Sequence, residues 1–325
     1  MRPMILKGHE RPLTMVKFNR EGDLVFSSAK DKVATAWYAS TGERLGTYVG
    51  HNGAVWGLDS DWFCSRLITG SADNSAKLWD AQRGTVLHTW EYKSPIRAVA
   101  FAPGDRIVTM ASTALMGQTP DVYLHRLTDE LMGVEGAEPV LKLVGLDMNV
   151  VRILWYPTGD LVLTASEDGC VRRWDAETGT MLDCKKLHTS RINDCQWGPD
   201  HFCFITASSD QYAKVVDAAS LEVMKTYKME APVNSASMSP THPHVLLGGG
   251  QEASQVTTTD NRAGKFEGRL YHLVYETEIG RVKGHFGPIN TVSFSPNGRQ
   301  YVSGAEEGYI RLHTFDQDYF TRNYN

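Results

Sequence analysis

Apolar and polar residues alternate along short segments of the chain, and turn-forming residues separate these segments. Four such segments follow one another at residues 54–59, 66–71, 75–79 and 85–90. The stretches between them are short and polar, as in Ala72-Asp73-Asn74. A period of two over four to six residues indicates half-buried β-strands, and short turns favour antiparallel neighbours. This part of the chain therefore predicts a four-stranded antiparallel sheet.

The same frame recurs along the chain. Copies of the segment 70–80 stand at residues 28–38, 165–175, 207–217 and 304–313. Aligning them on Trp79 places Trp37, Trp174, Val216 and Leu312 at equivalent positions, with steps of 42, 95, 42 and 96 residues. Each long step spans two repeats, which predicts degenerate copies near residues 124 and 259, within 121–125 and 255–260. The repeat count is therefore seven.

A second marker precedes most of the units. It reads Gly-His or Leu-His and ends at His9, His51, His188 and His285. An aspartate follows three of these histidines after 22 residues, namely Asp31, Asp73 and Asp210. Four strands about every 42 residues are typical of a propeller blade. We predict an all-β fold, a single seven-bladed β-propeller domain over residues 1–325 with a short C-terminal tail at 317–325.

These markers resemble the WD-repeat family. The resemblance implies that Met4-Ile5-Leu6 supplies the outermost strand of the seventh blade and so closes the propeller. It also implies a buried hydrogen-bonded tetrad in each complete blade, formed in blade 2 by His51, Ser71, Asp73 and Trp79. Blade 4 would keep Ser166, Asp168 and Trp174 beside Leu146, and blade 5 would keep His188, Ser208 and Asp210 beside Val216. Blade 1 has Ala29 at the serine position, and blade 7 has Glu306 and Leu312 at the last two positions.

The tetrad residues also suggest a Ser-His-Asp catalytic arrangement. Their spacing repeats from blade to blade, which an enzyme site has no reason to do, so the structural interpretation is favoured. The sequence contains neither a Gly-x-Ser-x-Gly elbow nor a Gly-x4-Gly-Lys-Ser/Thr phosphate loop. His242 and His244 could bind a metal weakly, but a lone pair in a proline-rich turn is more often part of a surface loop, so the loop interpretation is favoured. We expect no catalytic, metal or cofactor site.

Composition narrows the class of protein further. The chain has 325 residues, of which 42% are hydrophobic and 22% charged, and its formal net charge is −5. This balance disfavours a dedicated nucleic-acid binder, for which a basic domain is typical. The sequence shows no apolar stretch long enough for a membrane helix or a secretory signal. The five cysteines form no Cys-x-x-Cys pair. We therefore expect a cytoplasmic protein with reduced thiols.

Two blades depart from the repeat and are candidate functional regions. Blade 3 carries an extended loop at 113–120 and a further segment at 130–138. Blade 6 is expected to carry about a dozen extra residues after Asp260, which lead into the segment 264–276. Loops longer than a fold requires are often functional, although neutral drift is an alternative.

Several segments outside the repeat frame resemble one particular family. The most specific are residues 247–253, 256–259, 264–267 and 280–290. They are similar to subunit i of the eukaryotic translation initiation factor three complex. The resemblance implies a non-catalytic subunit that binds the C-terminal segment of scaffold subunit b and also subunit g. Through that complex it would support loading of the small ribosomal subunit with initiator tRNA and messenger RNA, with no membrane and no direct sequence-specific nucleic acid as partners.

For partner docking we predict the surface around blades 5 and 6. Acidic and aromatic residues gather there, namely Asp210, Asp217, Tyr227 and Glu230. Such residues suit a partner helix that bears arginine and an aromatic anchor. For Asp210, completing the hydrogen bonds of its own blade is the alternative role. A signalling or ubiquitin-ligase adaptor propeller is the alternative function, and an enzyme is a third.

Overall fold

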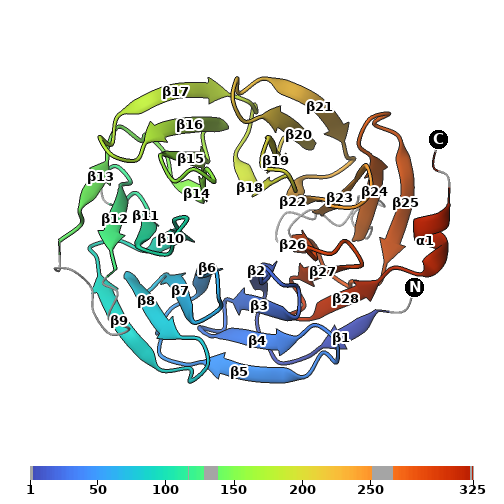
Figure 1. Cartoon of the computed structure of the whole chain (residues 1–325), viewed down its shortest axis with the longest axis horizontal. Helices are drawn as coiled ribbons and strands as arrows, with labels where there is room; N and C mark the ends of the chain where they lie inside the picture. Colours follow the sequence, from blue (N-terminus) through green and yellow to red (C-terminus); the bar gives the residue numbers. More distant parts are fainter. Residues whose placement is uncertain (1–2, 116, 128–137, 251–265, 323, 325) are drawn as a thin grey trace, which may run out of the picture. The chain divides into compact units, whose positions relative to one another are not determined.

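The computed structural model describes residues 3–115, 117–127, 138–250, 266–322 and 324. Its strands form seven four-stranded antiparallel sheets, which are the blades of a β-propeller; six sheets hold consecutive strands and the seventh pairs β1 with β28 (Figure 1). The predicted all-β, seven-bladed fold class is confirmed. Among the described residues no helix is long and apolar enough to cross a membrane.

The strands of blades 1 to 4 have the following bounds. Blade 1 holds β2 (Leu13–Phe18), β3 (Leu24–Ala29), β4 (Ala34–Tyr38) and β5 (Arg44–Tyr48). Blade 2 holds β6 (Val55–Ser60), β7 (Arg66–Ser71), β8 (Ser75–Asp80) and β9 (Val86–Glu91). Blade 3 holds β10 (Ile96–Phe101), β11 (Ile107–Ser112), β12 (Val122–Arg126) and β13 (Leu141–Leu143). Blade 4 holds β14 (Val150–Trp155), β15 (Leu161–Ser166), β16 (Cys170–Asp175) and β17 (Met181–Lys186).

The strands of blades 5 to 7 complete the set. Blade 5 holds β18 (Ile192–Trp197), β19 (Cys203–Ser208), β20 (Tyr212–Asp217) and β21 (Val223–Lys228). Blade 6 holds β22 (Val233–Met238), β23 (His244–Gly249), β24 (Glu267–His272) and β25 (Glu278–Lys283). Blade 7 holds β26 (Ile289–Phe294), β27 (Gln300–Ala305), β28 (Ile310–Thr314) and β1 (Met4–Leu6).

The seventh blade joins the two ends of the chain. Strand β1 pairs with β28, so that Met4 lies opposite Leu312 and Leu6 lies opposite Ile310. The predicted role of residues 4–6 as the fourth strand of this blade is confirmed. Pairing satisfies the backbone groups of β28, which would otherwise form an open sheet edge.

Two compact units make up the chain. One comprises residues 1–27, 36–45 and 193–325, with blades 5 to 7 and most of blade 1, and the other comprises residues 28–35 and 46–192, with blades 2 to 4. Each unit has cores of aliphatic and aromatic side chains contributed by neighbouring sheets, such as those around Trp155 and around Tyr271. The organisation of residues 1–325 as a single domain stays a prediction.

An asparagine at the same position of three first strands links successive blades of the first unit. Its side-chain Nδ2 donates to a backbone carbonyl of the next blade, from Asn193 to Val233 at 2.8 Å, from Asn234 to Ile289 at 3.0 Å and from Asn290 to Leu13 at 3.0 Å. Hydrogen bonds of this kind fix the register between sheets whose packing is otherwise apolar and non-directional.

Replacing Asn234 by alanine is expected to lower the free energy of unfolding by about 1 kcal/mol, because one half-buried hydrogen bond between blades is lost. Urea unfolding followed by circular dichroism measures the change. The exposed Asn52 offers a matched control, since the hydrogen bond recorded for it uses only its backbone N–H. An Asn234→Ala effect no larger than that of Asn52→Ala would contradict the linking role.

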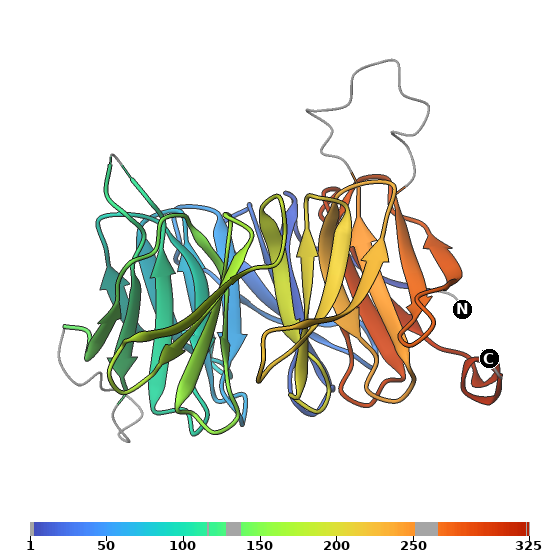
Figure 2. The same cartoon turned by 90° about the horizontal axis from the view of Figure 1, so that it is seen from above.

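The predicted C-terminal tail is partly helical. Helix α1 (Gln317–Thr321) buries Tyr319, whose ring stacks on Phe315 with the centroids 3.9 Å apart. The Tyr319 hydroxyl is also hydrogen bonded to His244 Nδ1 at 2.6 Å. Figure 2 shows α1, in red, beside the lower ends of the orange and red strands. These contacts attach the helix to blades 6 and 7 of the same unit.

The third strand of blade 6 corrects the sequence alignment. It is β24, at Glu267–His272, and not the segment 255–260, which lies outside the described residues. Pairing of Val245 with Tyr271 makes Tyr271 the counterpart of Trp79, which pairs with Leu67 in blade 2. The extra residues of blade 6 therefore precede the third strand, whereas counting repeats placed them after it.

Candidate functional site

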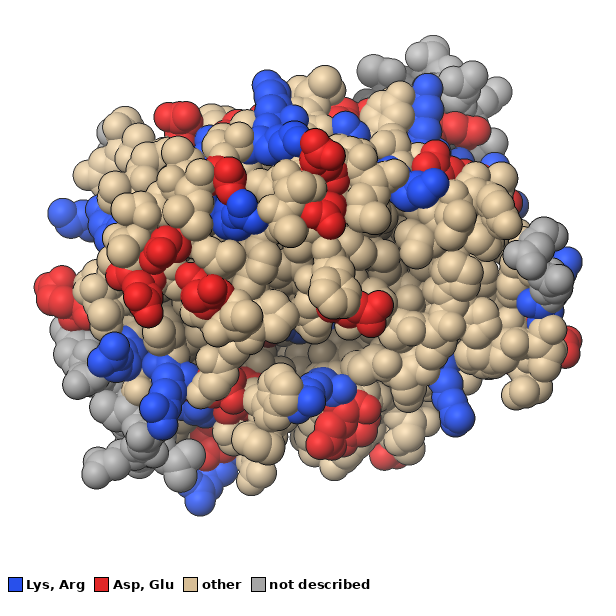
Figure 3. Space-filling view, turned by 45° about the horizontal axis from the view of Figure 1, so that its top comes forward, with Lys and Arg blue, Asp and Glu red and all other residues tan. Residues whose placement is uncertain are grey.

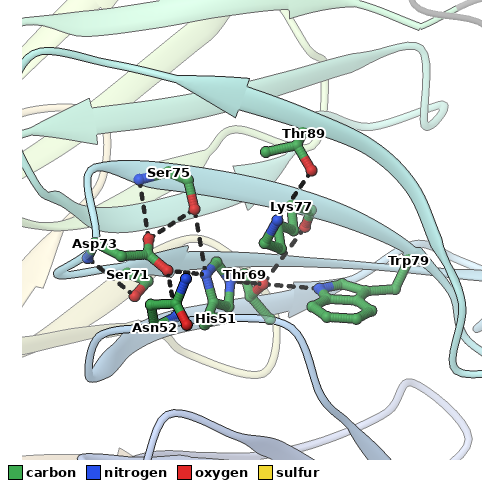
Figure 4. Close-up of polar contacts among 9 residues, drawn as sticks. All are labelled: His51, Asn52, Thr69, Ser71, Asp73, Ser75, Lys77, Trp79 and Thr89. Atoms are coloured by element: carbon green, nitrogen blue, oxygen red, sulfur yellow. Dashed lines mark hydrogen bonds and ion pairs between the residues drawn. The ribbon is translucent and has the colours of Figure 1, made fainter.

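Three polar side chains and one indole form a continuous network in blade 2, drawn in Figure 4. The Asp73 carboxylate lies 2.9 Å from His51 Nδ1, and the Thr69 hydroxyl lies 2.7 Å from His51 Nε2. Trp79 Nε1 donates to the same hydroxyl at 2.8 Å. Because the Asp73 carboxylate can only accept, His51 Nδ1–H donates to it, and Nε2 of the neutral imidazole then accepts from the Thr69 hydroxyl. The arrangement thus holds a neutral histidine of one tautomer.

The electrostatics of this network agree with that proton assignment. Burial lowers the pKa of His51, against the opposing effect of Asp73. Burial alone would raise the pKa of Asp73, but hydrogen bonds from Ser75, the Asn52 backbone and His51 together hold it well below its usual range. Asp73 is thus charged and His51 neutral near pH 7.

The hydroxyl member of the network is Thr69, which corrects the prediction of Ser71. Ser71 accepts a hydrogen bond from the Asp73 backbone N–H at 3.2 Å instead. Leu67 pairs with Trp79, so the indole reaches the residue two positions along β7, which is Thr69. Ser71 stands a further two residues away, roughly 7 Å along the strand, and is out of reach.

Other blades repeat this geometry at the same spacing. The hydroxyl lies 18 residues after the histidine. In blade 1 this residue is Ser27, whose hydroxyl accepts a hydrogen bond from Trp37 Nε1 at 2.8 Å and lies 2.8 Å from His9 Nε2. The hydrogen-bond network of blade 1 therefore lacks no hydroxyl, although Ala29 stands at the predicted serine position. In blade 4 Trp174 donates to Thr164 at 2.9 Å, so Ser166 is not its acceptor.

Blade 4 replaces the missing histidine with an arginine. Arg172 Nη2 donates to Asp168 at 2.6 Å and Nη1 to Ser166 at 3.3 Å, while Leu146 is buried at the histidine position. Burial alone would raise the pKa of Asp168, but the hydrogen bond and charge of Arg172 lower it. Arg172 was not among the residues predicted from the sequence. The available signal was a basic residue four positions after the carboxylate, which recurs as Lys77, Lys214 and Arg311.

Blade 7 corrects the predicted positions by one residue. His285 contacts Ser303 at 2.7 Å and Glu307 at 2.8 Å, so the carboxylate is Glu307 and not Glu306. Pairing of Tyr301 with His313 makes His313, not Leu312, the counterpart of Trp79. The 22-residue spacing from His285 leads to Glu307, whereas the alignment on hydrophobic residues slipped by one position.

Blade 3 has a different hydrogen bond at the tryptophan position. This position lies in residues 121–125, where the sequence predicts a degenerate repeat. His125 takes the tryptophan position of β12, and the Tyr92 hydroxyl is hydrogen bonded to its Nε2 at 2.8 Å. Of the extended blade 3 segments, residues 113–115 and 117–120 are described, whereas 130–137 lie outside the described residues.

In blade 5, Asp210 Oδ1 accepts from the Tyr212 backbone and Ser208 Oγ from the Asp210 backbone, and Val216 is buried at the tryptophan position.

The four residues predicted to bind a partner do not form one surface. Asp210 and Glu230 lie at one end of the β20–β21 hairpin, where Met229 N–H donates to Gln211, and Asp217 lies at the other end. Glu230 pairs with Arg269 at 3.3 Å. Tyr227 is buried, and its hydroxyl donates to the Leu273 carbonyl at 2.7 Å. Tyr227 therefore packs blade 5 against blade 6 and is not available as an anchor.

Asp217 shapes the turn between β20 and β21. Its Oδ1 accepts hydrogen bonds from the backbone N–H groups of Ala219 and Ser220 at 3.0 and 2.7 Å. The Ser220 backbone bond, more than any other contact, lowers the pKa of Asp217. In blade 6 His272 stabilises the corresponding turn in the same way, since its Nδ1 accepts hydrogen bonds from the backbone N–H groups of Val274 and Tyr275.

Exposed apolar side chains gather near the Asp217 end of the hairpin. Met224 of β21 is 57% exposed, and Tyr275 of the neighbouring turn is 58% exposed. Lys225 joins the two elements, since its Nζ donates to the Val274 carbonyl at 2.8 Å and lies 3.4 Å from Glu276. We name Asp217, Met224, Val274, Tyr275 and Glu276 the blade 5–6 surface. It combines apolar area with acidic groups.

Outside the blade 5–6 surface, positively and negatively charged side chains are mixed. On the face drawn in Figure 3, basic and acidic side chains are interspersed, and neither sign dominates. Among the described residues no three His, Cys, Asp or Glu side chains gather as a metal site. The residues that resemble a catalytic triad instead hold neighbouring strands together inside individual blades.

Seven four-stranded blades with repeated His–hydroxyl–Trp networks define a WD-repeat β-propeller. The family model described as EIF3I matches residues 1–325. The chain is 47% identical over 320 residues to eukaryotic translation initiation factor 3 subunit I of Rattus norvegicus, with 98% of each chain covered. Subunit I of Taeniopygia guttata is also 47% identical over 320 residues, and that of Culex quinquefasciatus 45% over 323, again with 98% coverage. The chain belongs to the family of subunit I of eukaryotic translation initiation factor 3, whose role is in translation initiation.

Proposed function

We propose that this chain is a non-catalytic scaffold subunit of translation initiation factor 3 that docks subunits b and g. In the cytoplasm it would support assembly of the 43S pre-initiation complex and the recruitment and scanning of messenger RNA on the small ribosomal subunit. Family membership over the whole chain supports the assignment to the complex. The hydrogen-bond networks support a structural role for the residues that resemble a catalytic triad.

The observation that carries the docking proposal is the exposed apolar area of the blade 5–6 surface beside its carboxylates. Burying Met224 and Tyr275 against a partner removes apolar area from water, which is the main driving force of association. Asp217 and Glu276 lie at the rim, where carboxylates attract a basic segment and fix its orientation. We assign the surface to the C-terminal segment of subunit b, in the form of a helix with basic and apolar residues.

We expect Met224→Glu and Tyr275→Ala each to weaken binding of the subunit b C-terminal segment about tenfold or more, the usual cost of losing a central apolar anchor. Binding is measured by isothermal titration calorimetry with the full-length chain. Met181→Glu is the matched control, because Met181 is a similarly exposed methionine of β17 in blade 4.

A second variant separates the two ends of the β20–β21 hairpin. Glu230→Arg changes the end that carries Asp210 and Glu230, and it should leave the affinity within about twofold. If Glu230→Arg abolished binding while Met224→Glu did not, the docking surface would lie at the Asp210 end. If the chain did not co-purify with other initiation factor 3 subunits, the scaffold function itself would be wrong.

A further inference from the structure

The turn between β24 and β25 carries two exposed members of the blade 5–6 surface. They are Val274 and Tyr275, which are 52% and 58% exposed. Their backbone N–H groups donate to Nδ1 of His272 at 3.1 and 3.2 Å. The position of both side chains therefore depends on hydrogen bonds that end on a single imidazole nitrogen. We name residues 273–277 the blade 6 turn.

Other blades place an aspartate where blade 6 has His272. Asp80, Asp175 and Asp217 each end the third strand of their blade, and each accepts from the backbone N–H groups two and three residues further on, at 2.7–3.0 Å. A carboxylate keeps this acceptor at any pH well above about 4. An imidazole accepts only through an unprotonated nitrogen. Of these four turns, the blade 6 turn is thus the one whose acceptor is lost when a proton is taken up near neutral pH.

The backbone of the blade 6 turn makes this acceptor important. Glu276 has a φ of 59°, in the left-handed region, whereas glycine stands at the equivalent position of blades 2 and 4, as Gly84 and Gly179. A residue with a Cβ adopts this conformation at a cost in free energy. The hydrogen bonds to His272 offset that cost, so the turn should loosen when they are lost.

The ring of His272 is 4% exposed and packs against two other rings. The centroid of the Tyr275 ring lies 4.5 Å from that of His272, and the centroid of the His244 ring, on β23, lies 5.9 Å from it. Three further titratable side chains contact His244, namely His242, Tyr319 and Tyr324. The carboxylate of the blade 6 turn, Glu276, is paired with Lys225 at 3.4 Å. A proton added to His272 therefore faces another imidazole and a phenol ring.

We propose that His272 positions the blade 6 turn for docking of the subunit b C-terminal segment and releases the turn when it is protonated. This inference rests on the docking surface proposed above. In the neutral ring Nδ1 accepts both N–H groups, so the ring proton lies on Nε2. A second proton occupies Nδ1, and the N–H groups of Val274 and Tyr275 then face a third donor. The turn loses the conformation that presents Tyr275.

Docking should therefore weaken between neutral and mildly acidic pH. Histidine is the residue type that gains and loses a proton between pH 5 and 8. The Asp217 carboxylate of the same surface stays charged over that range, because a hydrogen bond from the Ser220 backbone lowers its pKa. Loss of the carboxylate charge at Asp217 thus does not account for such a change.

The test measures binding of the subunit b C-terminal segment to the full-length chain by fluorescence anisotropy at pH 7.5 and 5.5. The unchanged chain should bind about tenfold more weakly at pH 5.5, as the loss of one or two hydrogen bonds implies. His272→Asn keeps an uncharged acceptor at both pH values, so its affinity should change less than about threefold. His272→Phe keeps a ring without an acceptor and should bind weakly at both. His201→Asn, which replaces an exposed histidine of blade 5, is the matched control and should keep the full pH dependence.

Hydrogen exchange of the Val274 and Tyr275 amides reports on the turn without any partner. Their protection, relative to the unfolded chain at the same pH, should fall at pH 5.5 in the unchanged chain and not in His272→Asn. Thermal unfolding shows whether each variant is folded.

Two results would overturn the role of His272. One is an equal pH dependence of binding and protection in the unchanged chain and in His272→Asn. The other is a turn that loosens at pH 5.5 while binding stays constant. If the unchanged chain did not bind the segment at pH 7.5, the docking surface itself would be wrong, and the exchange data would still decide whether His272 controls the turn.

Discussion

Replacing Thr69 by valine should lower the free energy of unfolding by about 2 to 6 kcal/mol, since each buried group left without a partner costs about 1 to 3 kcal/mol. The two groups affected are His51 Nε2 and Trp79 Nε1, which both use the Thr69 hydroxyl. Valine has nearly the shape of threonine, so the change removes the hydroxyl without opening a cavity. Urea unfolding followed by tryptophan fluorescence and circular dichroism measures the loss.

Two further substitutions serve as controls for this experiment. Thr69→Ser keeps the hydroxyl and should recover most of the stability. Ser71→Ala should cost no more than about 1 kcal/mol, because it removes one long hydrogen bond from the Asp73 backbone. A larger loss for Ser71→Ala than for Thr69→Val would show that the hydroxyl of the network has been assigned to the wrong residue.

Acid should destabilise this fold as the pH falls from 6.5 to about 4, because buried neutral histidines must take up protons. Burial lowers the pKa of three histidines from 6.5 to about 4, with help from neighbouring His88 at His125, from His242 and His272 at His244, and from His285 and Arg311 at His313. Between those pH values the unfolded chain binds more protons than the folded one, so stability falls as pH falls. The loss is up to about 3 kcal/mol for each histidine, and it is complete below the folded-state pKa.

Unfolding by urea at pH 7.5 and at pH 4.5 measures this dependence. His125→Gln removes one titrating group from a buried position, so the difference in unfolding free energy between the two pH values should shrink by up to about 3 kcal/mol. The variant is compared with itself at the two pH values, which cancels the cost of the substitution. A difference as large as in the unchanged chain would contradict the burial of a neutral histidine at this position.

Repetition explains why so much of the fold could be predicted from the sequence. The 22-residue spacing identified His51 and Asp73, and the tryptophan alignment identified Trp79, before any geometry was known. The hydroxyl could not be chosen in the same way. Both Thr69 and Ser71 carry hydroxyls two residues apart on β7, and only the register with β8 separates them.

The remaining errors have causes that counting along the chain cannot reveal. Blade 6 contains extra residues whose place, before or after the third strand, leaves the overall repeat length the same. The burial of Tyr227 depends on the Leu273 carbonyl, which the next blade contributes 46 residues later. Arg172 of β16 replaces a histidine from the loop before the first strand of the blade, so its role appears only once the chain is folded.

The pairing of β1 with β28 has a consequence for how the protein is made. Met4 is translated first, and its partner Leu312 follows 308 residues later. At about 5 to 20 residues per second, the first strand waits about 15 to 60 seconds for its partner. During that interval the nascent chain carries a solitary three-residue strand, and the seventh blade cannot form until residue 312 has been made. A factor that serves translation thus completes its seventh blade only after the other six.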